Sequence, residues 1–350
     1  MSGPFPEAKV DAVDRALMAA FGTNVLDSVA PLSGGLSGAA IYRIRVGAVP
    51  YLLRIEGARD AFRDPVRGYA CMRAAASAFV APRVRYADAD DGVAIMEFIA
   101  ERSLTLDYPG PRIALVTEAA QTLRALHETP GFPPLVDYMD GVAAMVGHLG
   151  AWSLAGPGKA AAELHARLAD AYRSDPADLV SSHNDLNPRN ILYDGARLWL
   201  VDWESAFRAD RFVDLACLAN FLTTSPEEEE ALLRVYFGRP PDEIGRARLL
   251  VMRQVNHLFY ALSFLSTVAP AQAETEATSP ALADLHQALG VGEFDLARPA
   301  NRLTYAESRL DAARAGMATE AFQRASERLS QLSSSPGSSG RPSPQPLGCS

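Results

Sequence analysis

The segment from His183 to Asn190 carries residue types that can transfer a phosphoryl group. It has a carboxylate at Asp185 and an amide five residues later at Asn190, and a second carboxylate, Asp202, stands twelve residues beyond that amide. Phosphoryl transfer from ATP uses one aspartate to accept the hydroxyl proton, and an asparagine and another aspartate to hold magnesium. Mg²⁺ needs few protein ligands, because phosphate oxygens and water fill its other positions. The spacing therefore predicts a phosphoryl-transfer site that uses ATP and Mg²⁺.

The local chain pattern is expected to bring these three residues together. Asp185 lies between an apolar pair and Pro188, which predicts a loop. Residues 191–201 read as a hairpin around an Asp-Gly turn, with Asn190 at the start of one strand and Asp202 at the end of the other. Because a hairpin folds the chain back on itself, Asn190 and Asp202 are expected to lie side by side.

Other chemistries fit this segment poorly. His183 and Asp185 could form half of a metal pair, but a zinc site needs further histidine or cysteine ligands, and Cys217 lies in an apolar, helix-like run. A serine hydrolase places its serine on a sharp strand-to-helix turn, whereas Ser181-Ser182 directly precede the histidine. We expect His183 to orient the loop by hydrogen bonding rather than to transfer protons.

Two features near the N-terminus are candidates for contacts with ATP. The glycine-rich turn contains Gly34, Gly35 and Ser37, and its backbone amides could approach phosphates closely, although no Gly-Lys-Ser/Thr of a Walker loop follows. Arg54 interrupts the apolar strand 51–55, so its charge must face either solvent or a ligand.

Periodicity predicts an α+β protein with two lobes. A small antiparallel-sheet lobe, residues 1–99, contains strands that alternate with period two and two helices, and a hinge is expected near residues 97–101. A larger, mainly helical lobe follows over residues 100–332. Residues 333–350 are rich in Ser, Pro and Gly and are expected to be disordered. The predicted strands are 41–46, 51–55, 84–86 and 93–98, and the predicted helices include 7–21, 65–79, 160–173, 242–267 and 303–331 with a break at Gly316.

The composition is that of a soluble cytoplasmic protein. The 350 residues are 48% hydrophobic with a net charge of −9, which argues against general nucleic-acid binding. Three scattered cysteines match no disulfide framework, and no apolar run reaches the roughly 18 residues of a membrane span. The oligomeric state is left open.

Together these residues resemble the choline/ethanolamine kinase and aminoglycoside phosphotransferase superfamily, whose fold is similar to that of protein kinases. The resemblance covers about residues 25–265 and is most specific over 181–222, where His183, Asp185 and Asn190 match the family pattern His-x-Asp-x-x-x-x-Asn. The resemblance implies that Asp185 is the catalytic base and that Asn190 and Asp202 bind Mg²⁺.

The resemblance also implies roles for residues outside the catalytic loop. Asp214 matches an aspartate that buttresses that loop, and Arg54 matches a Lys or Arg on the third strand that touches the ATP phosphates. The segment from Met96 to Ala100 would bind adenine through its backbone, with Glu97 and Ile99 as the expected contacts.

Two sequence details suggest which molecule accepts the phosphate. Asp202-Trp203-Glu204 followed by Ala206, and Arg in place of Lys at position 54, look like choline kinases. This implies transfer of the γ-phosphate to the hydroxyl of choline, ethanolamine or a similar cationic amino alcohol. Because aromatic faces bind quaternary ammonium groups, Phe259 and Tyr260 are candidate substrate residues together with Glu204; the alternative for the two aromatics is a place in the core.

Two positions depart from the family pattern. The usual Asn-Asp is Ala209-Asp210 here. The glutamate that normally pairs with the third-strand Lys or Arg would fall near Gly68, where no carboxylate stands; Glu56, Asp60 and Asp64 are possible substitutes. The missing glutamate is the one feature that supports an alternative function, a nucleotide-binding pseudokinase. An aminoglycoside or other antibiotic phosphotransferase is a further alternative, because the sequence discriminates poorly between these acceptors and an amino alcohol.

Overall fold

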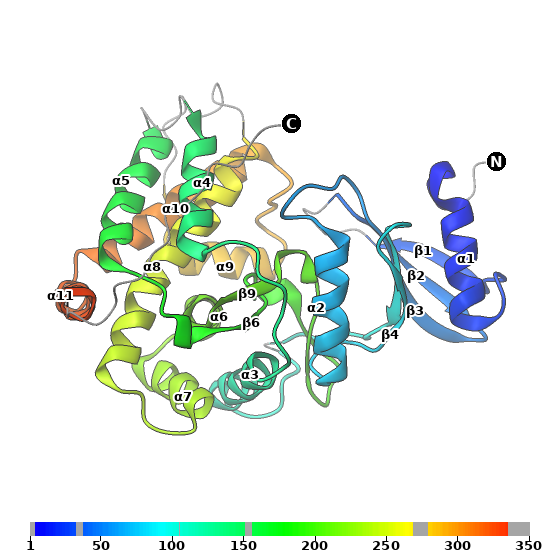
Figure 1. The fold of residues 1–350 in the computed structure, drawn as a ribbon, viewed down its shortest axis with the longest axis horizontal. Coiled ribbons are helices and arrows are strands. Elements are labelled where there is room, and N and C mark those ends of the chain that lie inside the picture. The colour runs from blue at the N-terminus through cyan, green and yellow to red at the C-terminus, as the bar shows by residue number, and fades with distance from the viewer. Residues whose placement is uncertain (1–3, 33–37, 105, 151–155, 269–278, 335–350) are drawn as a thin grey trace. The chain divides into compact units, whose positions relative to one another are not determined.

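The computed structural model describes residues 4–32, 38–104, 106–150, 156–268 and 279–334 (Figure 1). By their internal contacts the residues form two compact units. The first comprises residues 1–140 and 174–241, and the second comprises residues 141–173 and 242–350. The lobe boundary expected near residue 99 stays a prediction.

The first unit contains a five-stranded antiparallel sheet with the order β1-β2-β3-β5-β4. Helix α1 lies along one side of this sheet, and α2 connects β3 to β4 (Figure 1). The elements are η1 (Glu7–Lys9), α1 (Val10–Phe21), β1 (Ser28–Leu32), β2 (Ala40–Val46), β3 (Val49–Ile55), α2 (Pro65–Ser77), β4 (Val84–Asp88) and β5 (Val93–Glu97).

The alternation of β3 decides which face of the sheet Arg54 occupies. Tyr51, Leu53 and Ile55 are buried in one hydrophobic cluster with α1. Because successive side chains of a strand point to opposite faces, Leu52 and Arg54 project on the other side, where both line a cavity. The charge in this apolar strand therefore faces a potential ligand space and not the core.

The rest of the first unit frames the predicted catalytic loop. Strands β6 and β9 pair on either side of that segment, and β7 and β8 form the predicted hairpin, with Ile191 opposite Leu200. The hairpin is confirmed, but Asn190 ends a 3₁₀ turn just before β7 instead of beginning the strand. The elements are α3 (Arg112–His127), η3 (Pro176–Asp178), β6 (Leu179–Ser182), η4 (Pro188–Asn190), β7 (Ile191–Tyr193), β8 (Leu198–Leu200), η5 (Trp203–Ser205), β9 (Phe207–Asp210), α6 (Arg211–Leu222) and α7 (Pro226–Phe237).

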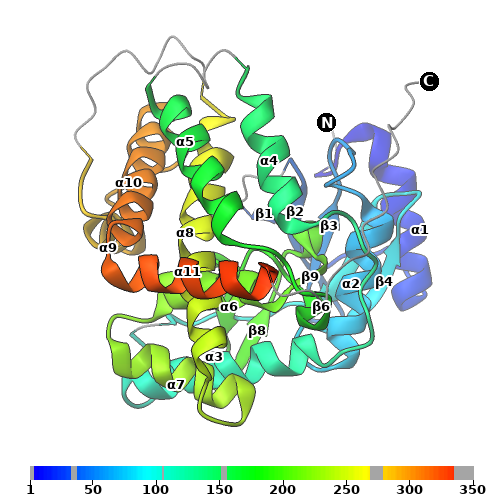
Figure 2. The same ribbon diagram turned by 60° about the vertical axis from the view of Figure 1, so that its left-hand side comes forward.

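The second unit is helical, and α11 lies across α8 and α5 (Figure 2). The predicted pattern 303–331 is confirmed as two helices, α10 and α11, that separate just after Gly316. Helix α11 reaches Ser334, so the first two residues of the predicted disordered tail are helical, and residues 335–350 lie outside the described residues. The elements are α5 (Gly156–Ala171), α8 (Glu243–Leu265), α9 (Leu282–Gly290), α10 (Pro299–Met317) and α11 (Glu320–Ser334), while α4 (Tyr138–His148) joins the units.

None of the described helices has the length and apolar character needed to cross a membrane.

The tight turn between β2 and β3 contains a residue in an unfavourable conformation. Gly47 and Ala48 both have positive φ, at 58° and 67°. A residue with a Cβ in this region costs about 1–2 kcal/mol, and glycine gives part of that back through its greater freedom in the unfolded chain. We therefore expect Ala48→Gly to raise the free energy of unfolding by about 0.5 kcal/mol in urea denaturation. Ala74→Gly, inside α2, is the control and should lower it by about 1 kcal/mol. A loss of stability in Ala48→Gly would contradict the turn geometry.

Candidate active site

A buried carboxylate fixes the loop that carries Asp185. Asp214 on α6 is fully buried and accepts hydrogen bonds from the backbone N–H groups of His183 and Asn184 at 2.8 and 2.7 Å. It also accepts from the hydroxyl of Ser182 at 2.8 Å and from Nε2 of His127 at 3.0 Å. Burial favours the neutral acid, but the hydrogen bonds from His127 and His183 outweigh it and lower the pKa of Asp214. An ionised Asp214 therefore holds both ends of a turn in which Asn184 adopts a φ of 66°.

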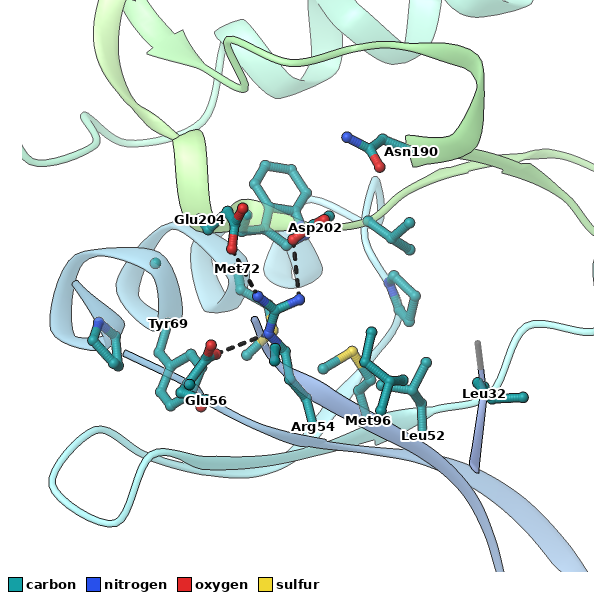
Figure 3. Close-up of a pocket in the computed structure, with 18 of the residues that line it drawn as sticks. Leu32, Leu52, Arg54, Glu56, Tyr69, Met72, Met96, Asn190, Asp202 and Glu204 are labelled. Carbon is teal, nitrogen blue, oxygen red and sulfur yellow. Dashed lines mark hydrogen bonds and ion pairs between the residues drawn. The ribbon is translucent and has the colours of Figure 1, made fainter. Parts of the chain in front are cut away.

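The carboxylate of Asp185 is oriented by two amides of its own loop. Nδ2 of Asn187 donates to Oδ1 at 3.0 Å, and Nδ2 of Asn190 donates to Oδ2 at 3.2 Å and to the Asp185 carbonyl at 2.8 Å. Because the amino group of Asn190 is engaged in this way, its oxygen is the atom that points toward Asp202 (Figure 3). The amide thus presents an oxygen donor to the cavity, as a Mg²⁺ ligand must.

His183 links the loop to the end of the hairpin. Its side chain is fully buried, and Nε2 donates to the carbonyl of Val201 at 2.9 Å, one residue before Asp202. Nδ1 has no hydrogen-bond partner among the described residues, and the ring lies 4.7 Å from that of Trp203. This geometry suits an orienting residue and gives no route for proton transfer to a ligand.

Arg54 stands at the centre of the site, surrounded by three carboxylates (Figure 3). Its guanidinium donates to Glu56 at 2.9 Å, to Asp202 at 3.0 Å and to Glu204 at 3.1 Å, and its side chain is only 10% exposed. Burial opposes the charge of Arg54, but the three anions outweigh this effect and raise its pKa. The same enclosure acts in the opposite sense on Glu204, where burial and the neighbouring Asp202 raise the pKa to about 7.

The carboxylate missing from α2 is replaced from β3. Gly68 carries no side chain, and a Cβ there would lie 3.5 Å from the carbonyl oxygen of Trp203, so α2 runs close to the backbone of η5. Glu56, the residue that directly follows β3, is the substitute that reaches the guanidinium of Arg54. Of the other two predicted substitutes, Asp60 pairs with Arg63 and Asp64 caps the first turn of α2.

A cavity of about 350 Å³ opens beside this cluster, which is the size range of small-ligand sites. Apolar side chains such as Leu52 and Met96 line one part of it, and Arg54, Asn190 and Asp202 line another. The predicted adenine-binding residues Glu97 and Ile99 also line it, as does Gly38 at the end of the glycine-rich turn. The predicted phosphate contacts Gly34, Gly35 and Ser37 lie outside the described residues.

Of the predicted substrate residues, Glu204 belongs to the Arg54 cluster, while Phe259 and Tyr260 lie on α8 of the second unit. Tyr260 is buried, and the guanidinium of Arg309 lies 4.8 Å from its ring centre and 5.1 Å from that of Tyr305. The chain's own cation therefore occupies the kind of aromatic face that would hold an ammonium group.

Comparison with known proteins matches this chain to one family. A sequence model of the phosphotransferase enzyme family matches residues 28–250. An uncharacterised protein of Metamycoplasma hominis is 30% identical over 73 residues, which is 21% of this chain and 15% of that protein. The matched segment is therefore a small part of that relative.

Several solved structures share the fold. A choline/ethanolamine kinase family protein from Mesorhizobium loti has a TM-score of 0.64 at 22% identity, covering 93% of this chain and 99% of that one. Choline kinase LicA from Streptococcus pneumoniae has a TM-score of 0.59 at 17% identity, covering 86% and 98%. Spectinomycin phosphotransferase, solved with ADP and spectinomycin, has a TM-score of 0.54 at 13% identity, covering 88% and 99%. The predicted α+β, kinase-like fold is thus confirmed.

The hydrogen bonds of Asp214 predict a large effect for a small change. Asp214→Asn replaces one acceptor oxygen by an amino group that faces donors, so we expect the free energy of unfolding to fall by about 3 kcal/mol in urea denaturation. Asp311→Asn, which alters an exposed pair with Arg314, is the matched control and should stay within about 0.5 kcal/mol of the parent. Equal effects of the two substitutions would contradict the buttressing role.

The contact between Gly57 and Gly38 predicts a second effect. A Cβ on Gly57 would lie 2.4 Å from the carbonyl oxygen of Gly38, so the backbone that leaves the glycine-rich turn must move. We expect Gly57→Ala to raise the apparent KM for ATP about tenfold, in line with the cost of small misplacements in a site. Gly131→Ala, where a Cβ meets nothing within 4 Å, is the control. An unchanged KM in steady-state kinetics would show that this close contact is not needed for nucleotide binding.

Proposed function

Because the chain belongs to the phosphotransferase enzyme family, we propose that it transfers the γ-phosphate of ATP to the hydroxyl group of a small-molecule acceptor. The observation that carries this proposal is a pair of hydrogen-bonded contacts: Asn190 donates to Asp185 at 2.8 and 3.2 Å, and the buried Arg54 donates to Asp202 at 3.0 Å. Arg54, Asn190 and Asp202 all line the same cavity. These are the residue types that phosphoryl transfer requires.

The proposed base is Asp185. Its carboxylate would accept the proton of the acceptor hydroxyl as that oxygen attacks the γ-phosphorus, and the bond from the γ-phosphorus to the β,γ-bridging oxygen breaks to release ADP. The amides of Asn187 and Asn190 hold the carboxylate in one orientation, which favours a reactive alignment before the reaction starts. His183 and Asp214 are proposed to contribute by fixing the loop, since both are fully buried and bond the backbone around it.

Asn190 and Asp202 fit a Mg²⁺ ion as oxygen donors, and such an ion would neutralise charge on the ATP phosphates. Arg54 is proposed to contact those phosphates from β3, with Glu56 keeping its guanidinium in place. Leu52 and Met96 offer the apolar surfaces for a purine ring, and the backbone at Glu97 and Ile99 would supply hydrogen bonds to adenine. The ADP bound to the spectinomycin phosphotransferase supports ATP as donor.

We propose an amino alcohol of the choline or ethanolamine type as acceptor. The Asp202-Trp203-Glu204 segment and the fold likeness to a choline/ethanolamine kinase family protein and to choline kinase LicA support this choice. The buried Tyr260, covered by Arg309, argues against that ring as the ammonium site. An antibiotic acceptor is the second candidate, supported by the fold likeness to spectinomycin phosphotransferase.

Removal of the proposed base should separate chemistry from nucleotide binding. We expect Asp185→Ala to lower kcat by about 10³-fold, because a positioned base contributes about 10²–10⁴-fold, while the Kd for ATP stays within about threefold of the parent. Turnover is followed by ADP release, and binding by titration calorimetry. Asp107→Ala, which removes an exposed loop carboxylate, is the control and should leave both quantities unchanged. Near-normal turnover in Asp185→Ala would rule out the assigned base.

A further inference from the structure

Helix α2 faces the site with a buried arginine instead of a glutamate. Arg67 stands directly before Gly68, and only 5% of its surface is exposed. An arginine cannot lose its charge in proteins, so the N–H groups of a buried arginine must donate hydrogen bonds to acceptors of the chain. The acceptors that Arg67 reaches therefore show which parts of the chain it holds.

The guanidinium of Arg67 bridges two segments through their backbone carbonyls. In the connection before α2 it donates to the carbonyls of Ala61, at 2.7 Å, and of Phe62. In the turn that follows Asp202 it donates to the carbonyls of Glu204 and Ala206, at 2.9 and 3.1 Å. Five N–H groups in a rigid fork make such a four-carbonyl bridge possible, and a lysine could not reproduce it.

Two neighbours of Arg67 complete the same contact. The absence of a side chain at Gly68 lets α2 lie against the Trp203 carbonyl, which is 3.5 Å from where a Cβ would be. One turn later the thiol of Cys71 donates to the carbonyl of Ala206 at 3.5 Å. One face of α2 is therefore docked on the backbone of residues 203–206.

The docked segment directly follows a strained residue of the site, Asp202. Asp202 has a left-handed backbone with a φ of 67°, which the surrounding structure must maintain. The side chains of Asp202 and Glu204 both bind Arg54. Whatever holds the backbone of residues 203–206 therefore also sets where these two carboxylates point.

We propose that Arg67 is a positioning residue for the phosphoryl transfer proposed above: it fixes the turn after Asp202 so that the Asp202 carboxylate faces Asn190 at the Mg²⁺-binding end of the cavity. The inference rests on the proposed function. In this chain α2 contacts the site through the bonds from Arg67 to backbone carbonyls. In the family pattern a glutamate on this helix pairs with the Lys or Arg of the third strand. Arg67 itself touches no substrate.

The test compares Arg67→Met and Arg67→Lys with the control Arg73→Met on the same helix. Arg73 is exposed and donates to the carbonyl of Ala87 at 2.7 Å, so its loss removes an arginine from α2 without touching the turn. The Kd for ATP is measured by titration calorimetry with and without Mg²⁺, and kcat and the acceptor KM are measured alongside.

We expect Arg67→Met to lose most of the Mg²⁺-dependent gain in ATP affinity, at least tenfold, and to lower kcat by a similar factor. The Kd for ATP without Mg²⁺ should change less than about threefold, since the proposed adenine contacts at Glu97 and Ile99 lie outside the turn that Arg67 holds. Arg67→Lys should fall between Arg67→Met and the parent, and Arg73→Met should match the parent. If Arg67→Met does not fold, Arg67→Lys carries the test, because it keeps the charge and most of the volume.

A purely structural role would lower the melting temperature of the Arg67 variants but leave the Mg²⁺-dependent affinity and kcat at the parent's values, and that result overturns the proposal. If the parent protein binds ATP with the same Kd with and without Mg²⁺, the proposed function is contradicted, and this inference is contradicted with it. The two failures are distinct, because the first is seen in the variants and the second in the parent.

Discussion

Arg54 is the charge on which the arrangement of the site depends. A guanidinium removed from water needs anionic partners, and this one draws them from two places in the chain: Glu56 at the end of β3, and Asp202 and Glu204 after β8. Arg54 thereby ties the end of β3 to the segment that follows the β7–β8 hairpin, at the edge of the cavity. Three carboxylates against one guanidinium leave an excess of negative charge, partly reduced by the raised pKa of Glu204. Such an excess is the electrostatic condition for a divalent cation.

A second buried charge, Asp214, fixes the loop that carries Asp185. It accepts hydrogen bonds from the backbone N–H groups of His183 and Asn184, directly before Asp185. Arg54 takes no part in these bonds. The two buried charges are linked through His183, which bonds the carbonyl next to Asp202. The proposed base Asp185 and the proposed metal ligand Asp202 are thus held by separate buried charges, Asp214 and Arg54, and His183 links the two segments. Such preorganisation favours catalysis by positioning.

Much of this site could be predicted from the sequence because its signals are local. The hairpin could be predicted from the Asp-Gly turn that lies between Asn190 and Asp202. The phosphoryl-transfer site could be predicted from the spacing of Asp185, Asn190 and Asp202. The pair β6–β9 was missed, since two four-residue strands separated by a long segment leave no periodic signal. Three carboxylates, Glu56, Asp60 and Asp64, were possible substitutes for the glutamate missing from α2. The sequence could not decide among them, because the pairing with Arg54 depends on how α2 packs. Arg67 was not singled out, as an arginine within a helical pattern normally lies in solvent.

The proposed reaction moves the γ-phosphate of ATP to the hydroxyl of a small amino alcohol. The most direct measurement is ³¹P NMR of the purified protein with ATP and Mg²⁺, against choline, ethanolamine, other amino alcohols, amino acids and aminoglycosides. We expect a new phosphomonoester signal with choline, ethanolamine or a related amino alcohol, together with stoichiometric ADP. A phosphomonoester formed only on an aminoglycoside would contradict the assigned acceptor. Bound ATP that is never transferred to any acceptor would contradict the proposed reaction itself and indicate a nucleotide-binding pseudokinase.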